Sequence, residues 1–237
     1  MNLPKPDQSA YLNAKPFPHL VLDDVMGYWE ISDVVEQWPK THESSLNGKD
    51  QKHKHYTNSE SFMPTAISKF IKIHFQSQEW IMFLEELTGI KGLVMDIRGG
   101  YGLHETMPGG ALKPHLDYLI HDVTGLQHRV NAILYLNEVQ SGGELELYEF
   151  NPDHGGYLTN KVSIQPKFNR IAIFNIDSKS WHGHPNPVIG NESRKSIALN
   201  YFSLPEKDSI RQQTIFTNGK KNIFKPFIPS VLYKILK

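Results

Sequence analysis

Residues 114–117 read Pro-His-Leu-Asp, and residues 180–185, far downstream, read Ser-Trp-His-Gly-His-Pro. Alternate residues of an extended strand point to the same side, so His115 and Asp117 are expected to present an imidazole and a carboxylate together. Two histidines and one carboxylate bind Fe(II) on one face of its octahedron and leave the opposite face open. The spacing therefore predicts an iron site formed by His115, Asp117 and a histidine of the second segment.

The third ligand is either His182 or His184, because both lie in one irregular segment and spacing alone does not choose between them. Four further histidines lie near the two segments in sequence, and we expect each to be a surface or hydrogen-bonded residue rather than a ligand. They are His104, His121, His128 and His154.

A basic residue follows the second segment at the start of a predicted strand. Arg194 lies about a dozen positions after the candidate histidines, and Ser196 lies two positions further on, on the same strand face. The planar guanidinium of arginine binds a carboxylate through two parallel hydrogen bonds. The pattern therefore predicts that Arg194 holds the far end of a dicarboxylate, with Ser196 as an additional donor.

The composition narrows the class of protein. The 237 residues include 25 Lys and Arg against 25 Asp and Glu, so no overall charge attracts nucleic acid. Cysteine is absent, which excludes disulfides, thiolate zinc sites and cysteine nucleophiles. The N-terminus lacks the apolar core of a signal peptide, and no run approaches the roughly 20 apolar residues of a membrane span. We therefore expect a cytoplasmic protein with no membrane span; its oligomeric state is left open.

The first ninety residues have mostly helical periodicity after an opening strand at residues 19–23. Helices are predicted at residues 27–38, 62–75 and 78–87, the last ended by Gly89, whereas residues 47–55 are polar and predict a solvated loop. Beyond residue 92 the period shifts towards two. Strands are predicted at residues 93–97, 102–107, 112–118, 129–136, 144–150, 161–165, 170–176 and 195–204.

These elements predict a mainly β fold with helical support (α+β), in which a jelly roll packs against N-terminal helices. Residues 1–92 are expected to form the N-terminal strand and helical support of the same domain, and residues 93–205 its core. Residues 206–237 are expected to form a C-terminal extension. The apolar tail at residues 224–237 predicts a helix docked on the domain, with a membrane-surface or partner-binding helix as the alternative.

Six ordered blocks make the chain resemble the Fe(II)- and 2-oxoglutarate-dependent oxygenases, specifically their prolyl 4-hydroxylase-like branch. The resemblance extends from about residue 102 to residue 202. The blocks are residues 103–106 leading into 114–117 (LHET, PHLD), 128–137 (HRVNAILYLN), 142–147 (GGELEL), 169–174 (NRIAIF), 180–185 (SWHGHP) and 194–199 (RKSIAL).

The resemblance implies a double-stranded β-helix, or cupin-like jelly roll, with His115, Asp117 and His182 as iron ligands. It favours His182 over His184 because the distal histidine of the family directly follows a bulky residue, here Trp181. Arg194 takes the position of the basic residue that pairs with the distal carboxylate of 2-oxoglutarate. Tyr135 matches a tyrosine that binds the same carboxylate, Ser196 is a further candidate contact, and Asn131 replaces a small hydroxyl residue that faces this pocket.

The activity implied is hydroxylation of an unactivated C–H bond, with release of succinate and CO2 from 2-oxoglutarate. Fe(II), 2-oxoglutarate and O2 are the expected cofactors, with ascorbate as a candidate reductant. The expected substrate is an amino acid, another metabolite or a prolyl residue, contacted by loops at residues 118–127 and 151–160. The alternatives are a non-catalytic binding module on the same fold and a cupin-type sugar-binding jelly roll.

Overall fold

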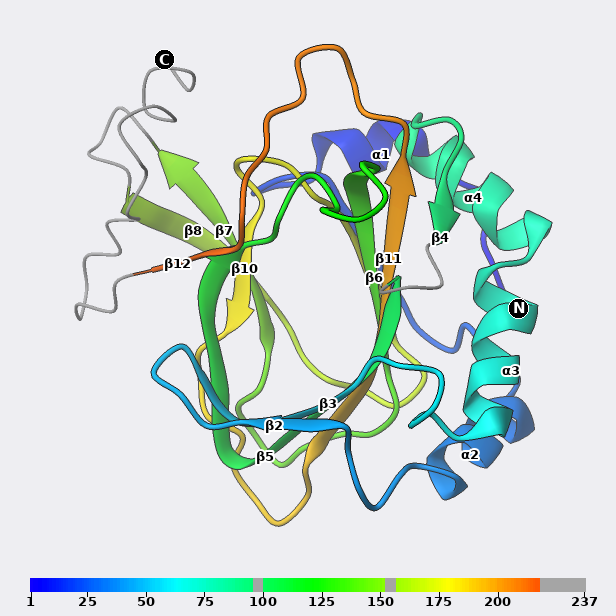
Figure 1. Cartoon of the computed structure of the whole chain (residues 1–237), viewed down its shortest axis with the longest axis vertical. Helices are drawn as coiled ribbons and strands as arrows, with labels where there is room; N and C mark the ends of the chain where they lie inside the picture. The colour runs from blue at the N-terminus through cyan, green and yellow to red at the C-terminus, as the bar shows by residue number, and fades with distance from the viewer. Residues whose placement is uncertain (96–99, 152–156, 218–237) are drawn as a thin grey trace.

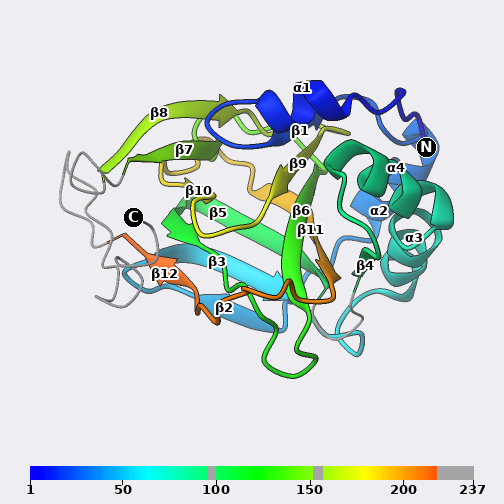
Figure 2. The same ribbon diagram turned by 90° about the horizontal axis from the view of Figure 1, so that it is seen from above.

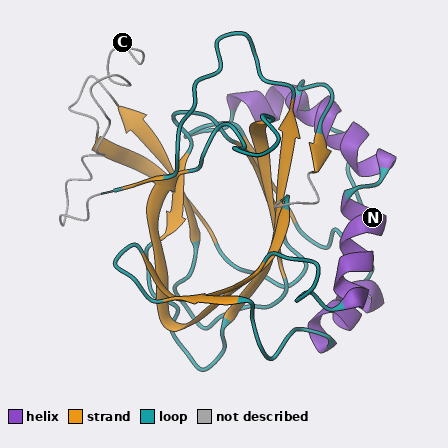
Figure 3. Cartoon of the chain, viewed as in Figure 1, coloured by secondary structure: helices purple, strands orange, loops and turns teal. Residues whose placement is uncertain are grey.

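The computed structural model describes residues 1–95, 100–151 and 157–217. Within these residues, four helices lie on one side of a curled antiparallel sheet (Figures 1 and 3). The helices are α1 (Gln8–Asn13), α2 (Tyr28–Glu36), α3 (Thr65–Phe75) and α4 (Gln78–Thr88). The first six strands are β1 (His19–Leu22), β2 (Ser44–Leu46), β3 (Gln51–Thr57), β4 (Val94–Met95), β5 (Tyr101–Leu116) and β6 (Gln127–Tyr135). The other six are β7 (Leu145–Asn151), β8 (Tyr157–Ile164), β9 (Ile171–Asn175), β10 (Trp181–His184), β11 (Arg194–Ser203) and β12 (Ile215–Phe216).

The sheet runs in the order β1-β9-β6-β11-β5-β10-β7-β8, and β3 and β12 also pair with β5. The long strand β5 therefore connects the two walls of the jelly roll. Its first half pairs with β11, and its second half pairs with β10. Figure 2 shows the β2–β3 hairpin on one side of β5, with β7 and β8 on the other.

Alternate side chains of β6 and β11 point to opposite faces of the sheet, one towards an apolar layer and the other towards the interior of the barrel. On β6, the alternate residues Val130, Ala132 and Leu134 belong to the same buried core as residues of α3 and α4. The residues between them, Asn131 and Ile133, line an internal cavity. Strand β11 alternates in the same way. One face of each strand therefore packs against the helices, and the side chains of the other face line the cavity.

Local sequence signals explain the boundaries of α4, a helix that is joined to β11 by a side-chain hydrogen bond. The Ser77 side chain accepts a hydrogen bond from the backbone N–H of Trp80, and Gly89 ends the helix in the left-handed conformation at φ 77°. The Trp80 side chain is fully buried and donates to the Tyr201 hydroxyl at 2.5 Å. Capping thus fixes the helix ends, and the indole attaches the helix to β11.

The predicted fold class is confirmed: a mainly β jelly roll packs against N-terminal helices. Among individual elements, the loop predicted at residues 47–55 is wrong in its second half, because β3 begins at Gln51. Strands predicted at residues 102–107 and 112–118 are one continuous strand, β5. The helix predicted at residues 224–237 falls outside the described residues. In the described part of the chain, no helix has the length and apolar character needed to cross a membrane.

Candidate metal centre and adjoining cavity

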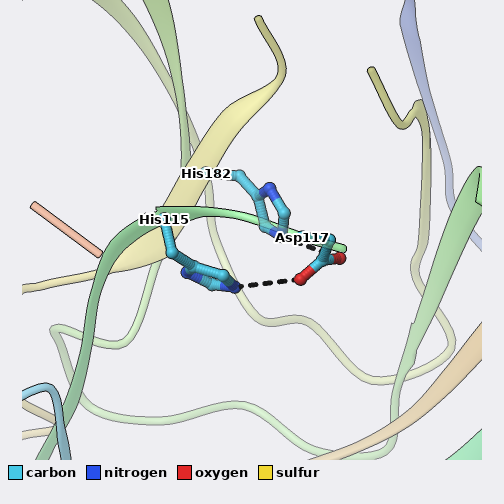
Figure 4. Close-up of side chains that lie close together, drawn as sticks. All are labelled: His115, Asp117 and His182. Carbon is cyan, nitrogen blue, oxygen red and sulfur yellow. Dashed lines mark ion pairs between the residues drawn. The ribbon is translucent and has the colours of Figure 1, made fainter. Parts of the chain in front are cut away.

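The side chains of His115, Asp117 and His182 are directed towards one another (Figure 4). His115 is the penultimate residue of β5, Asp117 directly follows that strand, and His182 on β10 is the cross-strand partner of His115. One potential ligand atom from each residue lies within 4.8 Å of the others. The Nε2 atoms of His115 and His182 are 3.4 Å and 3.6 Å from the two carboxylate oxygens of Asp117. One tight cluster thus contains both imidazoles and the carboxylate.

Backbone carbonyls fix the orientation of both imidazoles. Nδ1 of His115 lies 2.9 Å from the carbonyl oxygen of Lys113, and Nδ1 of His182 lies 2.9 Å from that of Ser180. Because a carbonyl only accepts, each Nδ1 carries the hydrogen and donates it. In the neutral imidazole, this leaves the lone pair of Nε2 directed at the cluster, as metal ligation by histidine requires.

The electrostatics of the cluster also suit a cation. Burial, and to a smaller extent the charge of His115, lower the pKa of His182 to about 4. Burial by itself would raise the pKa of Asp117, but the neighbouring His182 and His115 hold it well below its usual range. At neutral pH the donor set therefore contains the neutral His182 imidazole and the Asp117 carboxylate, together with the His115 imidazole. This is the ligand set of non-haem Fe(II) sites, so the residues present fit the metal.

Asp117 is held in place by a chain of hydrogen bonds from β6. The Asn131 side-chain amide donates to Oδ2 of Asp117 at 2.9 Å, and its carbonyl oxygen accepts from Nε2 of His128 at 2.7 Å. Both Asn131 and His128 are buried. The Asn131 amide thus contacts the carboxylate of the metal cluster.

A cavity of about 350 Å³ adjoins the cluster and extends between the walls of the barrel. His115, Asp117, His182 and Arg194 all line it. A dicarboxylate that bridged the metal cluster and Arg194 would therefore remain inside one continuous space. The volume falls within the range of small-molecule sites.

Arg194 is 3% exposed, and three acceptors fix its guanidinium. It donates to the carbonyl oxygen of Gly143 at 2.9 Å, to the Ser196 hydroxyl at 3.2 Å and to the Tyr135 hydroxyl at 3.2 Å. Gly143 is required here, because it adopts φ +67° and a Cβ atom would lie 3.1 Å from Cδ of Arg194. No carboxylate in the described ranges forms an ion pair with Arg194. A buried cation without a counter-charge fits an anionic ligand.

Ser196 and Tyr135, which were predicted to contact the same carboxylate, both lie close to Arg194. Ser196 lines the cavity, whereas Tyr135 is fully buried and is not among the lining residues. The Arg194 guanidinium lies 4.9 Å from the centre of the Tyr135 ring and also donates to its hydroxyl. Tyr135 therefore positions Arg194 from behind.

His182 and His184 have different environments. Nε2 of His184 lies 3.2 Å from Nζ of Lys54, and the cluster of potential ligand atoms contains His182 and not His184. The assignment of individual ligands stays a prediction, but the geometry favours His182.

Sequence reasoning left several lining residues of the cavity unassigned. His104 lines the cavity, and so does His128, which makes the expected hydrogen bond, here to Asn131. Lys54 and Tyr56 come from β3, and the Phe216 ring of β12 stacks on His115 with centroids 5.2 Å apart. The two-residue spacing of Lys54 and Tyr56 is compatible with a strand that directs both side chains to one face. The polar composition of the segment instead indicated a loop. Of the loops predicted to contact the substrate, residues 118–127 supply Tyr118, and residues 152–156 lie outside the described residues.

Comparisons with known proteins agree with this geometry. Solved structures with the same fold include HygX from Streptomyces hygroscopicus with nickel and 2-oxoglutarate bound (11% identity, 78% of this chain and 82% of that chain, TM-score 0.55). They also include a prolyl 4-hydroxylase from Pseudomonas putida (14% identity, 79% of this chain and 93% of that chain, TM-score 0.53). A third is a prolyl hydroxylase from Trichoplax adhaerens, in complex with a hypoxia inducible factor peptide (17% identity, 78% of this chain and 83% of that chain, TM-score 0.55).

No curated protein matches the chain by sequence. The family model of the 2OG-Fe(II) oxygenase superfamily matches residues 101–202, which contain the three residues of the metal cluster and Arg194. Over this segment the chain is therefore similar to the 2OG-Fe(II) oxygenase superfamily.

Proposed function

We propose that this protein hydroxylates an unactivated C–H bond of a small molecule or a prolyl residue, with iron held by His115, Asp117 and His182. One observation carries the proposal: the three potential ligand atoms lie within 4.8 Å, and the cavity that they line also contains the buried Arg194. The bound iron, 2-oxoglutarate and O2 supply the oxidation, with release of succinate and CO2. The protein supplies position, charge and shielding from water.

Each residue has a separate task. The His115 and His182 imidazoles direct Nε2 at the metal because their Nδ1–H groups are held by backbone carbonyls. Asn131 keeps the Asp117 carboxylate oriented towards the same point. Arg194 binds the distal carboxylate of 2-oxoglutarate, and Tyr135 and Ser196 orient its guanidinium. The hydroxyl hydrogen of Ser196, which lines the cavity, remains available to the same carboxylate.

The substrate enters where the β2–β3 hairpin and β12 border the cavity. Ser44, Asn58 and Thr214 contribute polar groups there, and Phe216 contributes an aromatic ring beside His115. Both substrate classes have precedent among proteins of this fold. HygX was solved with hygromycin B bound, and the Trichoplax adhaerens enzyme with a peptide.

An anaerobic visible-absorption titration tests this function without knowledge of the substrate. Fe(II) and 2-oxoglutarate are added to the metal-free protein, separately and together, in the wild type and in Asp117→Ala. A charge-transfer band that needs both additions and is lost in the variant supports the proposal. A folded wild-type protein without any band would instead identify a non-catalytic binding module on the same fold.

A further inference from the structure

The end of the cavity at Arg194 contains a second cation. Lys54 on β3 and Arg194 on β11 are both paired with Thr106 on β5, one on each side of it. Directly paired residues of antiparallel strands present their side chains on the same face, so Lys54 and Arg194 extend from the same inner face. Both line the cavity.

Lys54 is buried, and among the described residues it has no acidic partner. It is 2% exposed, and Nζ contacts Nε2 of His184 at 3.2 Å and lies 5.1 Å from the centre of the Tyr56 ring. Across the ranges the structure describes, no carboxylate lies within ion-pair distance of this ammonium group. Burial, and secondly the charge of Arg194, lower the pKa of Lys54 well below its usual value.

Other lysines of the chain show what a structural role looks like. The Lys161 ammonium pairs with Glu146, and that of Lys113 pairs with Asp50 at 3.0 Å. A buried lysine that only filled space would be less favourable than methionine, because burying an uncompensated charge is unfavourable. Lys54 therefore lowers the stability of the empty barrel, and this cost is explained if an anion enters the cavity.

The location of Lys54 indicates which kind of anion would enter the cavity. Its charged neighbour is Arg194, whereas the metal cluster already contains the carboxylate of Asp117. The buried imidazole of His184 adds polarity beside Lys54, and its Nδ1 has no hydrogen-bond partner in the part of the chain that the structure describes. The group that fits is thus a carboxylate located between Lys54 and Arg194.

We propose that Lys54 is a second cation for the distal carboxylate of 2-oxoglutarate, which it holds together with Arg194. This inference rests on the proposed function. It makes Lys54 a determinant of co-substrate choice, because the gain from two cations exists only for a 2-oxo acid with a second carboxylate. A monocarboxylic 2-oxo acid would leave both charges buried and unpaired.

Anaerobic calorimetric titration of the Fe(II)-loaded, substrate-free protein tests the inference. The ligands are 2-oxoglutarate and 2-oxopentanoate, which has the same chain length without the distal carboxylate. The variants are Lys54→Met and Lys54→Gln, with Lys52→Met as the matched control, since Lys52 is exposed on the same strand. We expect the Lys54 variants to bind 2-oxoglutarate about 10- to 100-fold more weakly, with unchanged binding of 2-oxopentanoate and no effect of Lys52→Met.

Three results would overturn the inference. Unchanged 2-oxoglutarate affinity in both Lys54 variants would show that Lys54 serves another anion, such as a carboxylate of the substrate. Equal weakening of both 2-oxo acids would show a general effect on the barrel. Absence of 2-oxoglutarate binding to the wild-type holoprotein would reject the proposed function itself, and this outcome is distinct from the other two.

Discussion

The side-chain amide of Asn131 donates a 2.9 Å hydrogen bond to Oδ2 of Asp117 and accepts one from His128 through its carbonyl oxygen. The amide orientation is therefore determined from both ends. Asn131→Leu keeps the branching and the number of side-chain heavy atoms but removes this donor, and we expect Fe(II) affinity to fall about 10- to 100-fold, as for other groups that orient a ligand. Metal titration monitored by absorbance measures it. Asn191→Leu, at an exposed position, is the control. Unchanged affinity in Asn131→Leu would contradict an orienting role.

The two histidines of β10 should differ in their contribution to metal binding. His182→Gln should abolish stoichiometric Fe(II) binding, because Nε2 of His182 lies in the cluster. His184→Gln should keep it, because Nε2 of His184 faces Lys54 instead. The iron content after anaerobic loading and gel filtration distinguishes the two variants. Retained iron in His182→Gln with loss in His184→Gln would reverse the ligand assignment.

Arg194 should determine the affinity for 2-oxoglutarate. Arg194→Lys keeps the charge but loses the planar fork that donates two parallel hydrogen bonds, so we expect the Kd to rise about 10-fold. Equilibrium titration of the iron-loaded protein measures this change. Arg170→Lys is the matched control, because Arg170 pairs with Asp23 outside the cavity. Equal Kd values in wild type and Arg194→Lys would reject Arg194 as the anchor.

The metal-free protein should lose stability in mild acid. Burial lowers the folded-state pKa of His182 to about 4, against about 6.5 in the unfolded chain. Between these values the unfolded state binds more protons, so stability falls as pH decreases from 6.5 to 4, by about 3 kcal/mol for this residue. The pKa of His104 is lowered by burial in the same direction. Thermal unfolding in the presence of a chelator should show a falling Tm. A Tm that stays constant from pH 7 to 5 would contradict the buried neutral imidazoles.

Glu105 on β5 links Ser193, the residue directly before Arg194, to Trp38 and His42 in the segment after α2. Its carboxylate accepts from Trp38 at 2.9 Å, from His42 at 2.7 Å and from the Ser193 hydroxyl. Although burial raises the pKa of Glu105, these hydrogen bonds lower it to about 2, so its contribution to stability exists above pH 4.5 and is lost as pH falls towards 2. Glu105→Leu should lower the free energy of unfolding by about 2–4 kcal/mol. Urea denaturation at pH 7 measures it, with the exposed Glu192→Leu as control. A loss no larger than that of the control would show that the three hydrogen bonds contribute little.

The fold class could be predicted from local sequence because apolar periodicity reports directly on burial. Alternation in residues 129–136 reflects a strand whose one face packs on helices, and Gly89 ends α4 where the sequence indicates. His115 and Asp117 lie together for an equally local reason, since they are two residues apart on extended chain. Their position opposite His182 depends on the pairing of β5 with β10, which the motif indicates only through family resemblance.

The strand β3 was missed because it lines a polar cavity. Hydrophobic periodicity detects a strand by its apolar face, and the residues that β3 directs inward include Lys54 and Tyr56, which look like surface residues in sequence. The sequence alone determined which chemical groups the protein has for binding a metal and a carboxylate, and in which order they occur. Only the tertiary structure decided that Lys54 and Phe216 join them, because strand pairing over long separations along the chain determines what faces a shared interior.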